Sequence, residues 1–285
     1  MIIAIEKHGA RAHIDTLGAQ LISFERRGVE CLWQGDASSW NGHSPFLFPV
    51  IGKVNEGCFT IEGLAYPTEI HGFAKDFCWE LTKKEDTRIE LVLASSPETL
   101  RHYPFDFILG STFEMTDGGL VIERRITNAS NRLMPFFSGE HPGFKVPLLP
   151  DDEFDKCVLE FERKETVNAY DYSGTFRGQS YPCLNNEQRI ELTRSLFNEK
   201  RVLLLYGLKS ESVTLHCRNR PSVTLGIKGF SSLGIWTTPQ KAAFVCIEPW
   251  NGLPSKEDSP LELSRKEGVT LLEPQQSFTY SYFIR

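Results

Sequence analysis

The sequence of 285 residues lacks several features that would place it in a familiar class of protein. It contains no apolar run near the roughly 18 residues that a membrane-spanning helix needs. Its first residues show no basic segment followed by a long apolar stretch, as a signal peptide would. Basic residues are outnumbered, 31 against 37 acidic ones, which leaves a net charge of -6. Nucleic acids and anionic membranes require a basic surface, so neither is expected as a partner.

Motifs that bind metals or nucleotides are also missing. The seven cysteines are scattered and form no C-x-x-C pair, so neither a zinc cage nor a thioredoxin-like site is indicated. Among the histidines, His8 and His13 alone have a zinc-like spacing, but a predicted hairpin there disfavours a shared ion. P-loop and G-x-S-x-G patterns are absent. The sequence motifs thus give no indication of a metal or nucleotide site. Free thiols without an export signal predict a cytoplasmic location.

The sequence does contain a clear alternation of apolar and polar residues with a period of two, which is typical of half-buried strands. It covers four segments: 89–93, 107–115, 120–126 and 278–282. Helical pattern is limited to a short segment, Pro97–Pro104, and residues 251–260 have the composition of a long loop. Long helices do not alternate with strands, which argues against a parallel α/β sheet. We predict a single all-β domain over residues 1–285, of antiparallel sandwich type.

Four stretches depart from this alternation and contain residue types that suit acid–base chemistry. They are "SPFLFPVIGKVNEG" with Lys53, "EIHGFAKDFCWE" with His71 and Lys75, "FFSGEHPGFKVPL" with His141, and "AFVCIEPWNGLPS" with Glu248. These residues have a functional and a purely structural interpretation.

Glu248 follows directly after the apolar run Val245–Ile247. Desolvation at the end of a buried strand would raise the pKa of its carboxyl group toward values useful for a general base. Pro249 cannot donate a ladder hydrogen bond, so the strand is expected to end there. The alternative is a carboxylate at a solvated strand end, because structural ion pairs also place acidic residues in such positions.

His141 lies between Gly139 and Gly143, and His71 is followed by Gly72. Glycine lets a backbone bend sharply, which could bring either ring close to a ligand. Each histidine could instead be a turn residue that is hydrogen-bonded to the backbone. Ser138 is a conceivable nucleophile, but no base for it can be identified nearby in the sequence.

Taken together, these stretches resemble the aldose 1-epimerase (galactose mutarotase) family. "FPVIGKVNEG", "HGFAKDFCWE", "GEHPGFKVPL" and "IEPWNG" occur in the family's order and at its approximate spacing, between Phe48 and Gly252. "HGFAK" looks most like a divergent branch of mutarotase-related proteins and hexose-6-phosphate mutarotases. The resemblance implies a large antiparallel β-supersandwich with an open sugar cleft. It also implies that Glu248 is the catalytic base, His141 the acid and His71 a second active-site histidine.

This resemblance implies an isomerase that interconverts the α and β anomers of an aldohexose without a cofactor. Glu248 would take the proton of the anomeric hydroxyl and His141 would protonate the ring oxygen, both with pKa values near neutrality. His71 could stabilise the charge that develops. Trp236 and Phe144 are candidates for an apolar floor under the sugar, although large aromatic residues also serve as core.

The chain departs from the family at Lys53 and Lys75, where arginine is usual. Lysine lacks the planar, two-pronged contact of guanidinium, but two lysines could still hold a phosphate as point charges. An aspartate that contacts sugar hydroxyls in the family has no assignable counterpart near residues 198–200. A hexose-6-phosphate mutarotase, or a non-catalytic carbohydrate-binding protein that retains the cleft, therefore remain alternatives. A small-molecule sugar is the expected partner, and the sequence indicates no oligomeric state.

Overall fold

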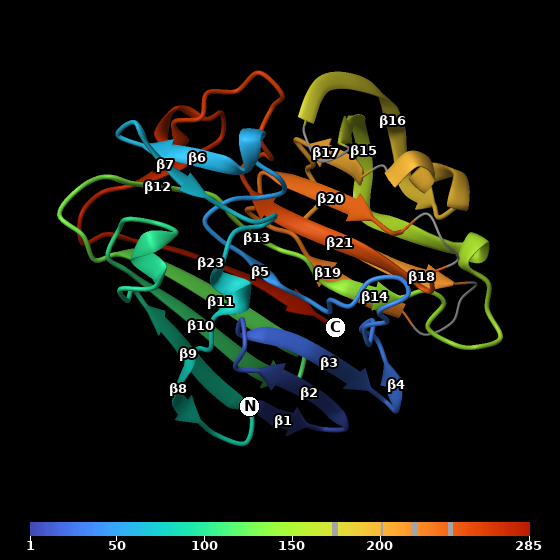
Figure 1. Cartoon of the computed structure of the whole chain (residues 1–285). Helices are drawn as coiled ribbons and strands as arrows, with labels where there is room; N and C mark the ends of the chain where they lie inside the picture. The colour runs from blue at the N-terminus through green and yellow to red at the C-terminus, as the bar shows by residue number, and fades with distance from the viewer. Residues whose placement is uncertain (173–175, 201, 218–221, 239–241) are drawn as a thin grey trace.

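The computed structural model describes residues 1–172, 176–200, 202–217, 222–238 and 242–285, with the backbone alone at 171, 176–179 and 198–200. Within these residues the regular structure is almost entirely β-strand, and every pairing between named strands is antiparallel (Figure 1). Helix occurs only as short 3-10 turns in the described chain. The all-β, antiparallel class predicted from the sequence is confirmed.

One large sheet holds fifteen of the described strands. Its hydrogen-bonded order is β5 (Phe46–Leu47), β13 (Ser138–Glu140), β21 (Phe244–Asn251), β20 (Ser232–Trp236), β17 (Val202–Tyr206), β15 (Cys157–Tyr172), β18 (Ser212–Cys217), β19 (Ser222–Gly226), β23 (Ser277–Ile284), β11 (Gly119–Asn128), β10 (Phe107–Thr116), β9 (Arg88–Ala94) and β8 (Glu80–Lys84). Beside this path, β14 (Gly143–Lys145) pairs with β21 and β16 (Phe176–Glu191) pairs with β15.

Smaller elements cover the large sheet. A separate four-stranded sheet contains β1 (Ile2–Lys7), β2 (Ala10–Asp15), β3 (Gln20–Arg26) and β4 (Val29–Glu30). Two strand pairs form further small sheets: β6 (Cys58–Ile61) with β7 (Leu64–Pro67), and β12 (Met134–Phe136) with β22 (Thr270–Leu272). The 3-10 turns are η1 (Asn55–Gly57), η2 (Ala74–Asp76), η3 (Thr99–Arg101), η4 (Phe154–Lys156), η5 (Arg194–Lys200) and η6 (Leu263–Arg265). None of the described helices is long and apolar enough to cross a membrane.

The predicted alternation is confirmed in all four segments, which lie in β9, β10, β11 and β23. Along β10, buried side chains alternate with more exposed ones, as expected for a strand with one face on the core. The predicted short helix appears as the 3-10 turn η3. The predicted hairpin near His8 is formed by β1 and β2.

Strand β21 continues through Pro249, so the prediction that it ends there is wrong. Proline has no N–H to donate, and the sheet accommodates it at an interruption. On one edge, β21 pairs with β14 as far as Cys246 and with β13 only from Trp250 onward. The N–H of Ile247 points to the same edge and donates to the carbonyl of Pro142 (3.2 Å). Pro249 therefore lies in the gap between β13 and β14, where no ladder hydrogen bond is lost.

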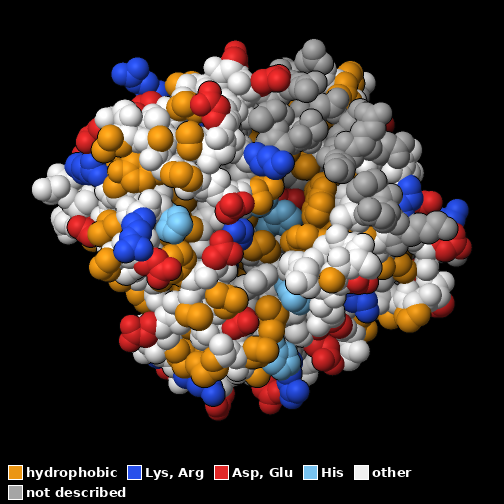
Figure 2. Space-filling view, in the orientation of Figure 1, with side chains coloured by type: hydrophobic (Ala, Val, Ile, Leu, Met, Phe, Trp, Pro, Cys, Tyr) orange, Lys and Arg blue, Asp and Glu red, His pale blue; other side chains and the backbone are white. Residues whose placement is uncertain are grey.

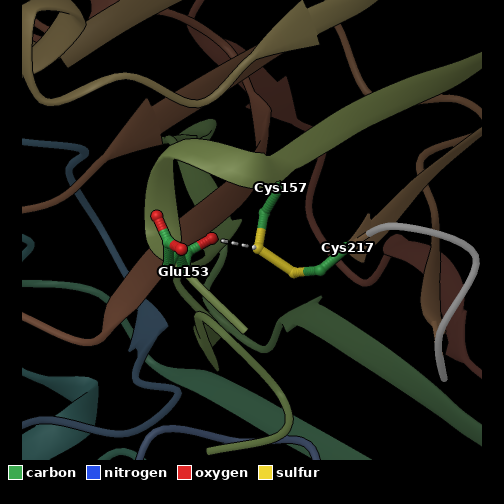
Figure 3. Close-up of a disulfide and its surroundings, with 3 residues drawn as sticks. All are labelled: Glu153, Cys157 and Cys217. Atoms are coloured by element: carbon green, nitrogen blue, oxygen red, sulfur yellow. Dashed lines mark hydrogen bonds between the residues drawn. A yellow bond between two sulfur atoms is a disulfide. The ribbon is translucent and has the colours of Figure 1, made fainter. Parts of the chain in front are cut away.

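The cysteines are not all free, contrary to the expectation from the sequence. Cys157 and Cys217 form a disulfide that links β15 to β18, and their positions face each other in the register of these strands (Figure 3). The Sγ atom of Cys157 also contacts the backbone carbonyl of Glu153 (3.3 Å). The remaining five cysteines are unbonded. The predicted cytoplasmic location was based partly on free thiols. It stays a prediction.

Arg124 of β11 lies on the buried face of the large sheet, where the alternation requires an apolar residue, and its side chain is 1% exposed. Its guanidinium donates to both carboxylate oxygens of Glu140 (3.0 Å each) and to the hydroxyl of Ser111 (2.5 Å). The hydroxyls of Tyr280 and Tyr282 donate to the same two carboxylate oxygens (2.9 Å each). Every oxygen of this buried carboxylate is thus paired, as burial of charge requires.

We expect Arg124→Ala to lower the free energy of unfolding by about 3–5 kcal/mol, because it leaves the carboxylate of Glu140 buried and unpaired. Arg11→Ala is the matched control. It removes an ion pair with Glu6 whose side chains are 54% and 61% exposed, and should cost less than about 1 kcal/mol. Urea unfolding followed by tryptophan fluorescence measures both. Equal losses in the two variants would contradict the importance of the buried pair.

Candidate active site

A cavity of about 650 Å³ opens on the face of the molecule where β20, β21 and the gap between β13 and β14 meet. Its volume suits a small-molecule ligand. Six of the residues that the sequence singled out line it: Lys53, His71, Lys75, His141, Trp236 and Glu248. Figure 2 shows this face, with histidine and hydrophobic side chains gathered in the hollow near its centre. The structure therefore brings together four stretches that are far apart in the sequence.

His141 and Glu248 face each other because the sheet is interrupted between β13 and β14. His141 lies in this interruption, directly after Glu140, and its backbone N–H donates to the carbonyl of Pro45 (3.1 Å). Opposite it, β21 carries Glu248 in the stretch that neither β13 nor β14 covers. The Nε2 atom of His141 is 3.1 Å from Oε2 of Glu248, and the two side chains are 8% and 2% exposed. The interpretation of Glu248 as a solvated strand-end carboxylate is therefore wrong.

Burial pushes both groups of this pair toward their neutral forms. Desolvation raises the pKa of Glu248 well above its ordinary value, in the direction predicted from the sequence. The same burial lowers the pKa of His141 to about 4, below the near-neutral value that we expected. Between these two pKa values the pair therefore holds one exchangeable proton, shared by two atoms at hydrogen-bond distance.

The orientation of His71 is fixed by the backbone of Gly52. The N–H of Gly52 donates to Nδ1 of His71 (3.0 Å), and the N–H of His71 donates back to the carbonyl of Gly52 (3.0 Å). Because Nδ1 accepts a hydrogen bond, the proton of the neutral ring is on Nε2. Burial is the main cause that lowers the pKa of His71 well below its usual value. His71 thus offers a neutral N–H donor.

Glycine follows His71 for a steric reason. Gly72 has a positive φ of 73°, and a Cβ atom there would lie 2.1 Å from the carbonyl oxygen of Phe48. His71 itself has a φ of 68°, in the left-handed region that few non-glycine residues adopt. Phe73 and Trp79, further along the same stretch, are buried and anchor it in the core.

The glycines beside His141 serve close packing, which differs from the sharp bending expected from the sequence. Neither Gly139 nor Gly143 is among the residues of positive φ. A Cβ atom on Gly139 would lie 2.6 Å from the ring of Trp250, and one on Gly143 would lie 2.6 Å from the ring of Trp40. Both glycines therefore let a tryptophan that lines the cavity approach the backbone on either side of His141.

An aromatic wall adjoins the pair. The ring of His141 has its centroid 5.1 Å from that of Trp40 and 5.8 Å from that of Trp236. Trp236 lines the cavity as predicted, whereas Phe144 is fully buried and is not among the residues that line it. Sequence reasoning missed Trp40, although a tryptophan in the polar stretch "SSWNGH" is a usable signal for an aromatic residue near the surface. It also missed Tyr172, for which no local signal exists.

The two lysines differ in their surroundings. Nζ of Lys75 lies 2.6 Å from the carboxylate of Asp76 and donates to the carbonyl of Gly72 (3.0 Å), so its charge is already engaged. Lys53 is exposed, and within the described part of the chain its ammonium group has no carboxylate partner. The backbone N–H of Lys53 donates to the hydroxyl of Tyr172 (3.2 Å), which places the residue at the cavity.

The side chains of residues 198–200, where a counterpart of the family's aspartate was sought, lie outside the described residues. Ser138, considered as a nucleophile, is fully buried, and its hydroxyl accepts from Nδ2 of Asn251 (3.4 Å). In the described chain, one group of three potential metal ligands occurs, namely His141, Cys246 and Glu248. Chemically, the cavity offers a shared proton, a neutral N–H donor and an apolar wall.

Comparison with known proteins agrees with this arrangement. A model of the aldose 1-epimerase family matches residues 1–282, and the chain belongs to that family. It is 29% identical over 296 residues to protein LacX (plasmid) of Lactococcus lactis subsp. lactis, a match that covers 100% of this chain and 99% of the relative. The family predicted from the sequence is thereby confirmed.

Solved structures show the same fold. A galactose mutarotase-like protein from Lactobacillus casei is 31% identical with a TM-score of 0.93, over 100% of this chain and 99% of the other. A galactose mutarotase related enzyme from Lactobacillus acidophilus is 25% identical with a TM-score of 0.94, over 100% and 96% of the two chains. The galactose mutarotase-like supersandwich predicted from the sequence is confirmed.

The contact between Gly52 and His71 yields a test of how the site is built. A Cβ atom on Gly52 would lie 1.8 Å from the hydroxyl oxygen of Tyr172, so Gly52→Ala should displace Tyr172 and break the hydrogen bond to Nδ1 of His71. Gly57→Ala is the control, because Gly57 has a similar φ (69° against 66°) and nothing lies within 4 Å of its Cβ position.

Both substitutions should lose about 1–2 kcal/mol of stability from the left-handed backbone alone. Only Gly52→Ala should lose more in urea unfolding and alter the nitrogen NMR shifts that report the tautomer of His71. If Gly57→Ala changed those shifts equally, backbone strain rather than the contact with Tyr172 would explain the effect.

Proposed function

We propose that the protein is an aldose 1-epimerase that interconverts the α and β anomers of an aldohexose by opening and closing the sugar ring. The observation that carries this proposal is the contact of 3.1 Å between Nε2 of His141 and Oε2 of Glu248 beside the cavity. Ring opening needs a base for the anomeric hydroxyl and an acid for the ring oxygen at the same time, and this pair supplies both.

The proton count of the pair matches the reaction. In the form with Glu248 ionised and His141 protonated, the carboxylate takes the proton of the anomeric hydroxyl. The C1–O5 bond then breaks, its electron pair goes to O5, and His141 protonates O5. The open-chain aldehyde remains beside a neutral carboxylic acid and a neutral imidazole. After C1 turns its other face, Glu248 gives its proton to the carbonyl oxygen and His141 takes back the proton of O5 as the C1–O5 bond forms, so no net proton enters or leaves.

Burial has a definite role in this cycle. It favours the neutral form of the pair, in which the proton lies on Glu248. The ionised form that starts the cycle is therefore the less stable one, so burial favours the proton transfers that accompany ring opening. His71 adds a neutral N–H donor that can hydrogen-bond the ring oxygen as negative charge develops on it.

Glu248→Gln and His141→Asn should each lower the enzymatic rate by about 10²–10⁴-fold, because each removes one half of the proton exchange. Equilibration of the pure α-anomers of glucose and galactose, followed by polarimetry with the spontaneous rate subtracted, measures this. Glu80→Gln, which changes an exposed strand residue, is the control and should keep the full rate. Wild-type protein that gives only the spontaneous rate would refute the proposal.

The same assay separates the alternatives. The exposed ammonium of Lys53 at the cavity favours a phosphorylated sugar as the second candidate substrate. If hexose 6-phosphates react faster than free hexoses and Lys53→Ala removes the preference, the protein is a hexose-6-phosphate mutarotase. Sugar binding by calorimetry without any acceleration would identify a carbohydrate-binding protein that retains the cleft.

The pH dependence follows from the single proton of the pair. Below the pKa of His141, near 4, both groups are protonated and no base remains, so the rate falls. Above the raised pKa of Glu248, the pair loses its proton and no acid remains, so the rate falls again. We expect a bell-shaped profile of kcat/KM, whose two limits belong to the coupled pair. A rate that keeps rising with pH would show that no shared proton is needed.

A further inference from the structure

Cys246 has no part in the proposed reaction, yet it lies beside the groups that carry it. It is two residues before Glu248 on β21, so both side chains point to the same face of the strand. Cys246 is fully buried, and in the described chain its sulfur atom has no hydrogen bond. It packs with Phe244 against the aromatic wall that includes Trp236.

Three different ligand atoms converge at this point. One atom each from His141, Cys246 and Glu248 lie within 4.8 Å of one another. In a tetrahedral zinc site with bonds of about 2.0–2.3 Å, neighbouring ligand atoms are about 3.3–3.8 Å apart. Shifts on the order of 1 Å would therefore bring all three to bonding distance, with the fourth position open toward the cavity that His141 and Glu248 line.

The ligand types of these three residues favour one kind of ion. A thiolate, an imidazole and a carboxylate together suit zinc, a borderline-soft cation, whereas magnesium and calcium prefer oxygen ligands alone. A divalent ion bound to one thiolate, one carboxylate and a neutral imidazole has no net charge. This neutrality suits a site in which all three side chains are buried. Binding would release the thiol proton and the proton of the acid–base pair to solvent.

We infer that His141, Cys246 and Glu248 form a binding site for zinc or a similar soft divalent cation, whose occupation blocks the acid–base pair. The cation and a sugar exclude each other, because both need the lone pairs of His141 and Glu248. The inhibition, but not the binding, depends on the function proposed above. Cys246 is the residue that distinguishes the metal site from the site of the reaction.

Titration of chelator-treated protein with Co²⁺ tests the site directly. We expect one ion per chain, a thiolate-to-cobalt charge-transfer band, and displacement of the cobalt by Zn²⁺ but not by Mg²⁺. Cys246→Ala should abolish the band and weaken Zn²⁺ binding by about tenfold or more. Cys246→Ser provides a second variant that fills the same space. Cys31→Ala, which removes another buried thiol, should leave the band unchanged.

Activity gives an independent readout. Zn²⁺ should inhibit the wild-type anomerisation, and Cys246→Ala should retain the rate without metal while requiring at least about tenfold more Zn²⁺ for inhibition. Absence of a thiolate band in the wild type, or a band that persists in both Cys246 variants, would overturn the inference. If the protein accelerates no sugar, the cobalt titration still decides the metal site, so the two proposals fail separately.

Discussion

The buried ion pair between Arg124 and Glu140 is the interaction on which the candidate site depends. It joins β11 to β13 at the point where the chain is about to enter the interruption that contains His141. The guanidinium also lies over the ring of Phe46 (4.8 Å to its centroid), on β5 next to β13. A buried pair stabilises only when its geometry satisfies all its donors and acceptors. This network therefore holds β13 in one position, and with it the residue that follows.

The interruption itself explains why the contact between His141 and Glu248 is located in the middle of a sheet. A continuous ladder would use the backbone of β13 and β14 along the whole of β21 and leave no room for side chains between them. The break leaves Pro249 without a required partner and gives His141 a direct approach to Glu248. Regular strands on both sides still fix the two residues, which favours the preorganisation that proton transfer needs.

Local pattern was sufficient for the strands and the class of fold, and together with the family resemblance it identified six of the residues that line the cavity. It was insufficient wherever a distant segment decides the outcome. The alternation placed Arg124 on the buried face, but only the tertiary structure supplies Glu140 as its partner. Glycines beside His141 suggested a bend, whereas the rings of Trp40 and Trp250 are the actual reason for them. The Cys157–Cys217 bond depends on the register of two strands that no local signal specifies.

The acid–base pair is carried by the sheet and its interruption, whereas several other residues that line the cavity are on irregular segments. Lys53 and Trp40 both lie in such segments, outside the named strands. Loops tolerate insertions and substitutions far better than the sheet that positions them. Under the function proposed above, evolution can therefore change which sugar is admitted without rebuilding the proton exchange. Directed evolution of new specificities could vary these loops while it leaves β11, β13 and β21 untouched.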